Sequence, residues 1–154
     1  MDSGYLECGM IAVYPFRLAH LSRIMEIELA SFPDSAYSPA MFRGLHRNCP
    51  DLFLVAKRSG RIAGYMVTCA EAKRAEIISL AVDPAEREAG VGAALMERTI
   101  RKLKRAEIRT IELAVRPENT AALRFYRRFG FTAIKRIAGY YEDGGDAVWM
   151  RKWM

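Results

Sequence analysis

Between Leu80 and Leu95 the chain passes from an apolar strand through a turn into a helix that opens with Gly90 and Gly92. The first turn of a helix presents backbone N–H groups without intrahelical partners, together with the positive end of the helix dipole. Both suit an anionic group such as a pyrophosphate. Glycine lets the main chain approach such a group without a Cβ in the way. The spacing excludes a Rossmann fingerprint, because Leu95 stands where a third glycine belongs, and no Gly-Lys-Ser/Thr marks a P-loop.

Apolar periodicity on both sides of this stretch predicts an α/β chain. Strands are expected over residues 11–16, 52–56, 62–69, 75–82, 110–115, 131–137 and 146–153, and helices over 19–32, 39–47, from 90 onward and over 119–129. This order favours a sheet of mixed direction with helices on both sides. No repeat, linker or low-complexity tract divides the 154 residues, so a single domain over residues 1–154 is expected.

Net charge and hydropathy limit the kinds of partner that this chain is expected to bind. The net charge is 24 − 18 = +6, and much of the excess lies in residues 101–105 and 124–128. Both runs fall toward the C-terminal ends of expected helices, where cations are favourable. No base-stacking aromatic motif accompanies them, so we expect solvated helix faces and no nucleic-acid partner. No apolar stretch reaches the ~18–20 residues of a membrane helix, and residues 1–15 do not resemble a secretory signal.

The cysteines and histidines predict neither disulfides nor a metal site. Cys8, Cys49 and Cys69 are odd in number and widely spaced, which argues against a disulfide framework and a zinc knuckle and favours a reducing, cytoplasmic setting. Cys69, within an expected strand, is interpreted as a small core side chain. His20 and His46 have no neighbouring ligand pattern, so no metal is expected.

Three motifs in order resemble the GNAT acetyltransferases. Arg87-x-x-Gly90-x-Gly92 after a strand resembles their acetyl-CoA motif, and residues 119–131 resemble their Asn…Leu-Tyr…Gly-Phe helix. Residues 139–147, Gly-Tyr-Tyr-Glu-Asp-Gly-Gly-Asp-Ala, resemble the hairpin of RimI-type protein N-terminal acetyltransferases and their archaeal relatives. The resemblance covers about residues 52–150, with a weaker echo at 30–33. It implies the GNAT fold: a mixed, mostly antiparallel sheet, splayed at the acetyl-CoA site, with helices on both faces.

The resemblance also implies how acetyl-CoA is held. The cosubstrate would lie between the strand ending at Val82 and the strand over residues 110–115. Backbone groups of Leu80, Ala81 and Val82 would pair with the pantetheine arm and polarise the thioester carbonyl. The residues implied to cradle the pyrophosphate are Arg87, Glu88, Ala89, Gly90, Val91, Gly92 and Ala93.

Two of these implied contacts carry an alternative. Glu88 stands where the family usually has Arg or Gln, so we expect its side chain to face solvent rather than the phosphates. Asn119 is implied to lie on the cofactor side, but it is also well placed as a plain helix N-cap, and the two roles are compatible.

Acetyl transfer needs a neutral amine and an acid for the departing thiolate. Tyr126 matches the family tyrosine at the thioester sulfur and is the candidate acid, although its helical spacing also suits a core tyrosine. An α-amine with a pKa of ~7.7–8.0 is partly neutral near pH 7, so a weak base or a water chain suffices.

The general base is left open. RimI-type enzymes usually have Leu-Glu-Val-Arg where this chain has Leu-Ala-Val-Arg, so Ala114 replaces the expected glutamate. Glu112 lies two residues earlier on the same strand face, and Glu76 lies on the neighbouring strand. We prefer Glu76 slightly. The remaining alternative is that both are ordinary strand carboxylates and that water is the base.

Four aromatic residues are implied to wall the acceptor groove: Phe32, Tyr37, Tyr140 and Tyr141. Ordinary aromatic packing is the alternative for the two hairpin tyrosines. We therefore expect direct transfer, without an acyl-enzyme, from acetyl-CoA to the α-amino group of a protein or peptide, a ribosomal protein being one candidate. The enzyme would be a monomer or homodimer without a membrane partner. A small-molecule amine or lysine acceptor, and a non-catalytic CoA-binding regulatory domain, are the alternatives.

Overall fold

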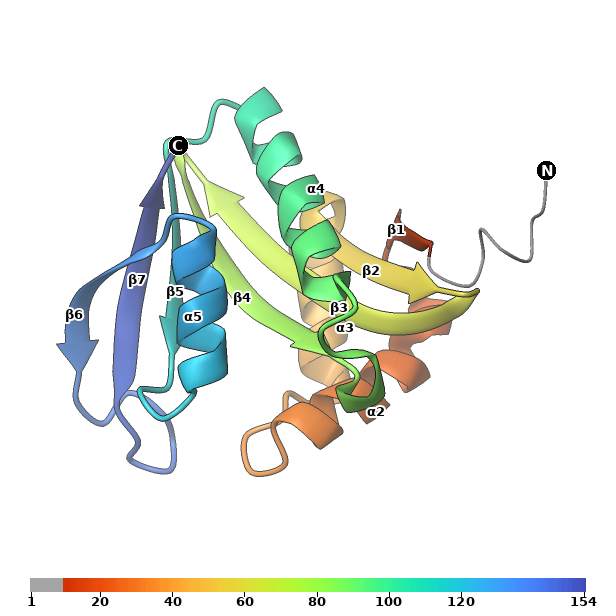
Figure 1. The fold of residues 1–154 in the computed structure, drawn as a ribbon, viewed down its shortest axis with the longest axis horizontal. Coiled ribbons are helices and arrows are strands. Elements are labelled where there is room, and N and C mark those ends of the chain that lie inside the picture. Colours follow the sequence, from red (N-terminus) through yellow and green to blue (C-terminus); the bar gives the residue numbers. More distant parts are fainter. Residues whose placement is uncertain (1–9) are drawn as a thin grey trace. The chain divides into compact units, whose positions relative to one another are not determined.

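The computed structural model describes residues 10–154, whose elements are labelled in Figure 1. The strands are β1 (Ile11–Pro15), β2 (Phe53–Arg58), β3 (Arg61–Glu71), β4 (Arg74–Val82), β5 (Thr110–Val115), β6 (Thr132–Ile137) and β7 (Ala147–Trp153). The helices are α2 (Leu21–Ser31), α3 (Pro39–Asn48), α4 (Val91–Arg105) and α5 (Thr120–Arg128). Short 3₁₀ turns stand at Leu18–His20, Pro50–Leu52 and Pro84–Glu86.

The strands of the described residues form one seven-stranded sheet in the order β1-β2-β3-β4-β5-β7-β6. The pairs β1–β2, β2–β3, β5–β7 and β6–β7 are antiparallel. By contrast β4 and β5 are parallel, pairing Arg74–Glu76 with Thr110–Glu112. Parallel neighbours require a crossover connection, and α4 lies in the chain between these two strands. The expected α/β sheet of mixed, mostly antiparallel direction is confirmed.

The chain divides into two compact units. The first comprises Met1–Cys69 and Ile78–Leu103, and the second comprises Ala70–Ile77 and Lys104–Met154. A single domain over residues 1–154 stays a prediction.

In the first unit, the two faces of the β2–β3 hairpin pack against different helices. Phe53 and Val55 of β2 belong to an apolar cluster shared with α2 and α3. Because successive strand residues face opposite sides, Met66 of β3 points the other way. There its sulfur accepts a hydrogen bond from Thr99 Oγ1 of α4 at 3.4 Å. Helices thus cover both faces of this part of the sheet, as expected.

In the second unit, β5 is the most buried strand, and its side chains are buried on both faces except at Ala114. Helix α5 turns Leu123 and Tyr126 inward, and the Tyr126 ring meets the Phe131 ring edge-on at 5.7 Å between centroids. Strand β6 pairs with β7 at one edge of the sheet and is exposed along nearly all its length.

The predicted elements are all present, and the main differences are at their ends. Strand β5 occupies the predicted residues, whereas β2 and β3 are longer than predicted. Ser59 and Gly60 have φ values of 54° and 78°. A two-residue turn with both φ positive matches the twist of paired strands, so the hairpin closes tightly and pairing extends from Arg58 to Arg61. The helix predicted over residues 19–32 begins with a 3₁₀ turn and ends at Ser31.

The prediction about the cysteines is wrong. Cys49, at the end of α3, and Cys69, on β3, form a disulfide with a Cα–Cα distance of 5.4 Å. This disulfide could not be predicted from the sequence, because the two residues are 20 positions apart and are brought together only by the fold. Cys69 is therefore half of a covalent link rather than a free core thiol, and the argument from cysteine usage for a reducing compartment loses its basis. Cys8 lies outside the described residues.

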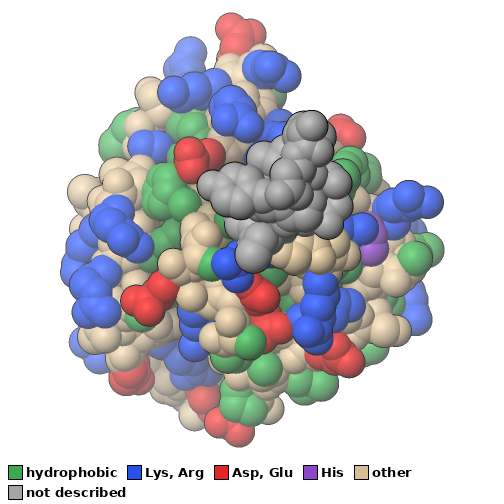
Figure 2. Space-filling model, turned by 45° about the vertical axis from the view of Figure 1, so that its right-hand side comes forward, with side chains coloured by type: hydrophobic (Ala, Val, Ile, Leu, Met, Phe, Trp, Pro, Cys, Tyr) green, Lys and Arg blue, Asp and Glu red, His purple; other side chains and the backbone are tan. Residues whose placement is uncertain are grey.

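Charged side chains are mixed on the face drawn in Figure 2, where Lys and Arg alternate with Asp, Glu and hydrophobic groups. Most basic side chains of the two runs are exposed, namely Arg101, Lys104, Arg105, Arg124, Arg127 and Arg128, which agrees with their interpretation as solvated helix faces. Within residues 10–154 no helix is both long and apolar enough to cross a bilayer.

Candidate active site

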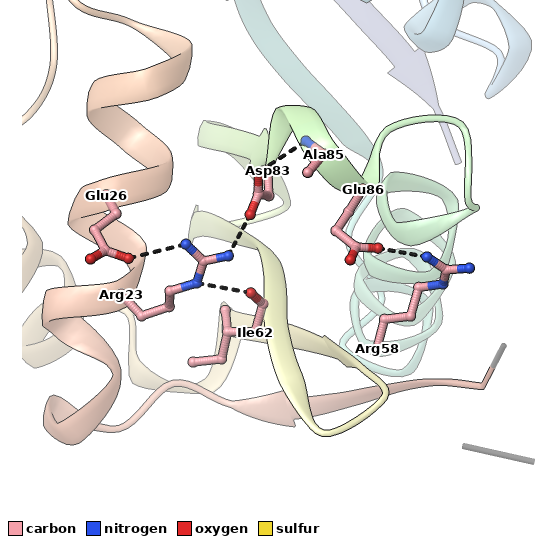
Figure 3. Close-up of polar contacts among 7 residues, drawn as sticks. All are labelled: Arg23, Glu26, Arg58, Ile62, Asp83, Ala85 and Glu86. Atoms are coloured by element: carbon pink, nitrogen blue, oxygen red, sulfur yellow. Dashed lines mark hydrogen bonds and ion pairs between the residues drawn. The ribbon is translucent and has the colours of Figure 1, made fainter. Parts of the chain in front are cut away.

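The end of β4 is fixed by a network of polar contacts in the first unit (Figure 3). Asp83, the first residue after the strand, donates its backbone N–H to the Ala63 carbonyl at 2.7 Å. One oxygen of its carboxylate accepts from the Ala85 N–H at 3.0 Å, and the other pairs with the guanidinium of Arg23 on α2. Arg23 also donates from Nε to the Ile62 carbonyl at 3.1 Å. Helix α2 thereby sets where β4 stops.

A second ion pair holds the next residues. Arg58 of β2 contacts Glu86 with a 2.7 Å distance between Nη1 and Oε2 (Figure 3). The hydrogen bond from Ala85 and the Arg23 guanidinium hold the pKa of Asp83 below its usual value. The turn Pro84–Glu86 is therefore held by contacts at both ends. The segment that follows it, residues 87–93, is called the glycine loop and begins from a fixed position.

The loop after this turn opens α4 in the way expected for an anion site. Glu88 and Gly90 have φ values of +64° and +91°, and both are exposed. The Gly90 carbonyl accepts the first helical hydrogen bond, from Ala94 N–H at 3.0 Å. The N–H groups from Val91 to Ala93 consequently have no acceptor within the helix. They are donors at the positive end of a 15-residue helix.

A third glycine, which the sequence analysis did not single out, brings this helix start against the sheet. A Cβ built on Gly64 of β3 would lie 2.9 Å from the Ala81 carbonyl oxygen and 2.9 Å from Val91 Cγ1. Neither distance is sterically acceptable, so this position needs glycine. An isolated glycine inside a strand pattern is the sequence signal of such a close approach.

Tyr126, the candidate acid, lies in the second unit and is buried, with 8% of its surface exposed. Burial, and secondarily the proximity of Tyr141, raise the pKa of its phenol far above the ordinary value. The hydroxyl therefore holds its proton at any physiological pH. A buried, protonated phenol fits both a proton donor and a core tyrosine, the two roles that the sequence left open.

Asn119 is the N-cap of α5. Its side-chain oxygen accepts from the Ala122 N–H at 3.1 Å. The capping role is thus present, and the cofactor role stays a prediction.

The two candidate bases, Glu76 of β4 and Glu112 of β5, are paired across the parallel strands. Glu112 is 4% exposed and is surrounded by donors. Its carboxylate accepts from Trp149 Nε1 at 2.8 Å and contacts Arg74 and Arg151, each at 3.2 Å. Burial alone would raise the pKa of Glu112, but these donors and positive charges outweigh it and hold the pKa below the usual value.

Glu76 is in the opposite electrostatic situation. It is half-buried, and burial together with the negative charge of Glu112 raises its pKa, opposed in part by Arg74. The pKa of Tyr140 is also raised, first by burial of its hydroxyl and second by the negative charge of Glu76. Glu76 is therefore the more basic of the two carboxylates, whereas Glu112 is held as a charged structural group.

The β6–β7 hairpin loop carries Tyr140 and Tyr141, with their rings edge-to-face at 5.0 Å. Arg116, which follows β5, stacks on the Tyr141 ring with its Cζ 4.0 Å from the centroid. Its guanidinium also pairs with Asp143 at 3.0 Å. Tyr140 remains 43% exposed, an accessible aromatic ring beside Glu76.

The other two predicted aromatics lie in the first unit. Phe32 and Tyr37 are partly buried and pack against the cluster formed by α2, α3 and the sheet. The Tyr37 ring meets the Phe42 ring at 5.9 Å, and its backbone N–H is bound by Glu28 at 2.9 Å.

The second unit thus brings together Glu76, Glu112 and Tyr140, and the first brings Leu80–Val82 together with the glycine loop. Sequence reasoning missed Arg23 and Asp83, and also Trp149 and Arg151, since their contacts depend on strand register and helix placement. In the described part of the chain, no three His, Cys, Asp or Glu residues are grouped as a metal site would require.

Comparisons with known proteins agree with this geometry. The profile of the Acetyltransferase (GNAT) family matches residues 21–131. An uncharacterized N-acetyltransferase of Methanocaldococcus jannaschii is 36% identical over 139 residues, which is 89% of this chain and 88% of that protein. An N-alpha-acetyltransferase of Sulfurisphaera tokodaii is 27% identical over 147 residues, 87% of each chain. The crystal structure of Ard1 from Thermoplasma volcanium superposes with a TM-score of 0.89 at 28% identity, covering 94% of this chain and 97% of that one.

Proposed function

Because this chain belongs to the GNAT acetyltransferase family and is an N-acetyltransferase, we propose that it transfers acetyl from acetyl-CoA to the α-amino group of a protein or peptide N-terminus. The likeness to the Sulfurisphaera N-alpha-acetyltransferase, which runs along nearly all of both chains, is the observation that carries the choice of acceptor.

The glycine loop fits the diphosphate of the cosubstrate. The N–H groups from Val91 to Ala93 have no acceptor within the helix, and Gly90 has the positive φ that favours glycine. These free donors at a helix start suit an anion. Arg87 is exposed beside them and adds a positive charge. We assign binding of the pantetheine arm and polarisation of the thioester carbonyl to the main chain of Leu80–Val82. When bound, acetyl-CoA supplies an acetyl group already activated as a thioester.

The side chains of the second unit move the protons in this proposal. The amine attacks the acetyl carbon and forms a C–N bond while the C–S bond breaks. Glu76, with its raised pKa, takes the proton that the amine loses. Tyr126 gives its own proton to the departing sulfur and is reprotonated from solvent afterwards. Transfer is direct, so no acetyl group is carried by the protein.

The acceptor terminus would lie along Phe32, Tyr37, Tyr140 and Tyr141. We further propose that the two compact units act as one acetyltransferase domain, since the family profile runs through both.

A monomer or homodimer and a cytoplasmic location are part of the proposal. The Cys49–Cys69 disulfide bears on the location. Thiol trapping in intact cells followed by mass spectrometry tests it, because a cytoplasm that keeps thiols reduced would yield the two cysteines alkylated.

A peptide acetylation assay tests the acceptor class. The enzyme is offered a library of peptides with free N-termini and the same library with blocked N-termini, matched in lysine content. Tandem mass spectrometry then locates the acetyl group. Modification confined to free α-amines supports the proposal. Acetylated lysine in the blocked library, or turnover with small amines alone, contradicts it.

A further inference from the structure

Glu28 is an acidic residue at a position where the helix pattern calls for an apolar one. It lies in the last part of α2, on the face that also carries Ile24 and Ile27, and it is 2% exposed. A protein with an apolar residue of similar volume at such a buried position is usually at least as stable as one with a buried charge there. A residue that breaks the apolar pattern of its helix is expected at functional sites, where holding a group in place is worth a loss of stability.

The carboxyl of Glu28 connects three other segments of the first unit. Its Oε2 accepts from the Tyr37 backbone N–H at 2.9 Å. Its Oε1 accepts a hydrogen bond from the Tyr65 hydroxyl of β3 and another from Ser79 Oγ of β4 at 3.4 Å. Tyr65 and Ser79 also contact one another at 3.1 Å. None of these three partners is a cation, and burial raises the pKa of the carboxyl.

The segment held in this way is residues 32–38, which links α2 to α3. It begins with the Phe32 N–H bonded to the Glu28 carbonyl at 2.8 Å and turns back through Ser35 N–H to the Phe32 carbonyl at 3.2 Å. The Tyr37 N–H then meets the Glu28 side chain. Glu28 thus binds this segment at both ends, once through its main chain and once through its carboxyl.

We propose that Glu28 is a positioning residue for the acceptor side of the enzyme: its buried carboxyl locks residues 32–38 onto β3 and β4. Phe32 and Tyr37 are thereby presented in one conformation. This inference rests on the proposed function, because it concerns how the acceptor, and not acetyl-CoA, is received. Removal of the lock would loosen the segment and raise the acceptor KM, while the turn that precedes the glycine loop keeps its ion pairs, Arg23 with Asp83 and Arg58 with Glu86.

Hydrogen exchange of the Tyr37 amide tests the lock without any substrate. Glu28→Met keeps the volume but removes both acceptors, so loss of one hydrogen bond worth about 1–1.5 kcal/mol should speed exchange about tenfold. Glu28→Gln keeps one oxygen for the Tyr37 N–H and an amide that can face Tyr65, so its exchange should stay close to that of the wild type. Glu26→Met is the matched control, since Glu26 is exposed on the same helix and Arg23 retains Asp83 without it.

Steady-state kinetics test the consequence. Glu28→Met should raise the acceptor KM about tenfold and leave the KM for acetyl-CoA unchanged, and Glu28→Gln should restore the acceptor KM. Where Glu28→Met does not fold, Tyr65→Phe removes the hydroxyl donor while keeping the ring in the core. It should accelerate Tyr37 exchange and raise the acceptor KM in the same direction.

Three results would overturn the inference: unchanged Tyr37 exchange in a folded Glu28→Met, an equal rise of both KM values, or a Glu28→Gln as impaired in kcat as Glu28→Met. The last would mean that the charge itself takes part in the reaction. If the wild-type enzyme acetylates no free N-terminus, the proposed function fails, and the exchange experiment still decides whether the lock exists.

Discussion

At the scale of single residues, the site separates two carboxylates that the sequence could not rank. Glu76 and Glu112 face each other across β4 and β5, but only Glu112 is surrounded by Trp149, Arg74 and Arg151. Two titratable groups whose environments push their pKa values apart are the usual basis for different roles in one site. Here the difference favours Glu76 as the proton acceptor and leaves Glu112 as a fixed charge.

Substitution of the two glutamates should therefore move the pH–rate profile in different ways. The raised pKa of Glu76 places the acid limb of kcat/KM above the 4.5 of an ordinary glutamate, because the base works only when deprotonated. Glu76→Gln should remove the contribution of Glu76 and leave only the acid limb set by the α-amine of the acceptor. Glu112→Gln removes the nearby negative charge, so the Glu76 pKa should fall and the limb should move to lower pH. If both variants keep the wild-type profile, neither carboxylate is the base.

Tyr126→Phe should lower kcat by about 10²–10⁴-fold, the usual contribution of a general acid. The ring remains in its place beside Phe131, so the Kd for acetyl-CoA, measured by calorimetry, should hardly change. Phe129→Leu, at the C-cap of the same helix, serves as the packing control. Turnover in Tyr126→Phe at the wild-type rate would assign this residue to the core alone.

At the scale of elements, the glycine loop depends on strand β3 as much as on its own sequence. Gly64 admits the Ala81 carbonyl and the Val91 side chain at distances that no Cβ tolerates. Strand and helix ends were predicted within a few residues, because the apolar periodicity of a strand or helix is a local signal. The approach of β3 to the start of α4 is not local, so the contacts that require glycine at this position could not be predicted from the sequence.

Gly64→Ala should disturb both folding and cosubstrate binding. The added methyl meets backbone at Ala81, which cannot yield as a flexible side chain would. Overpacking of this kind costs about 1–3 kcal/mol, and the displaced helix start should weaken acetyl-CoA binding as well. Thermal melts with and without coenzyme A measure the two effects. Gly44→Ala in α3 is the control, because Gly44 has no positive φ and a Cβ there would meet only the Arg47 side chain at 3.9 Å. Equal losses in both variants would contradict the role given to Gly64.

The disulfide joins the end of α3 to β3 and closes a loop of 20 residues. In the chain-entropy account, a link of this span stabilises the folded state by about 3 kcal/mol, since it restricts the unfolded chain. Replacing Cys49 and Cys69 together by Ser should lower Tm by roughly 6–12 °C for a chain of this size. The single Cys8→Ser variant is the control. A double variant that melts with the wild type would show that the bond adds no stability.

At the scale of the whole molecule, the fold was predictable because three motifs stand in order along one chain. Arg87-x-x-Gly90-x-Gly92 lies at the start of α4, and Tyr126 lies near the end of α5. Periodicity alone gave the order of strands and helices, but not which strands are neighbours. The partners of Glu112 and Glu28 depend on that pairing, and for this reason the side chains that position the site could not be found from the sequence.

The bond between Cys49 and Cys69 gives one polypeptide two thermal stabilities, one for each redox state of its surroundings. A preparation kept in dithiothreitol would contain the reduced, less stable form. Variants compared in that buffer would all lack the stabilisation that the disulfide provides.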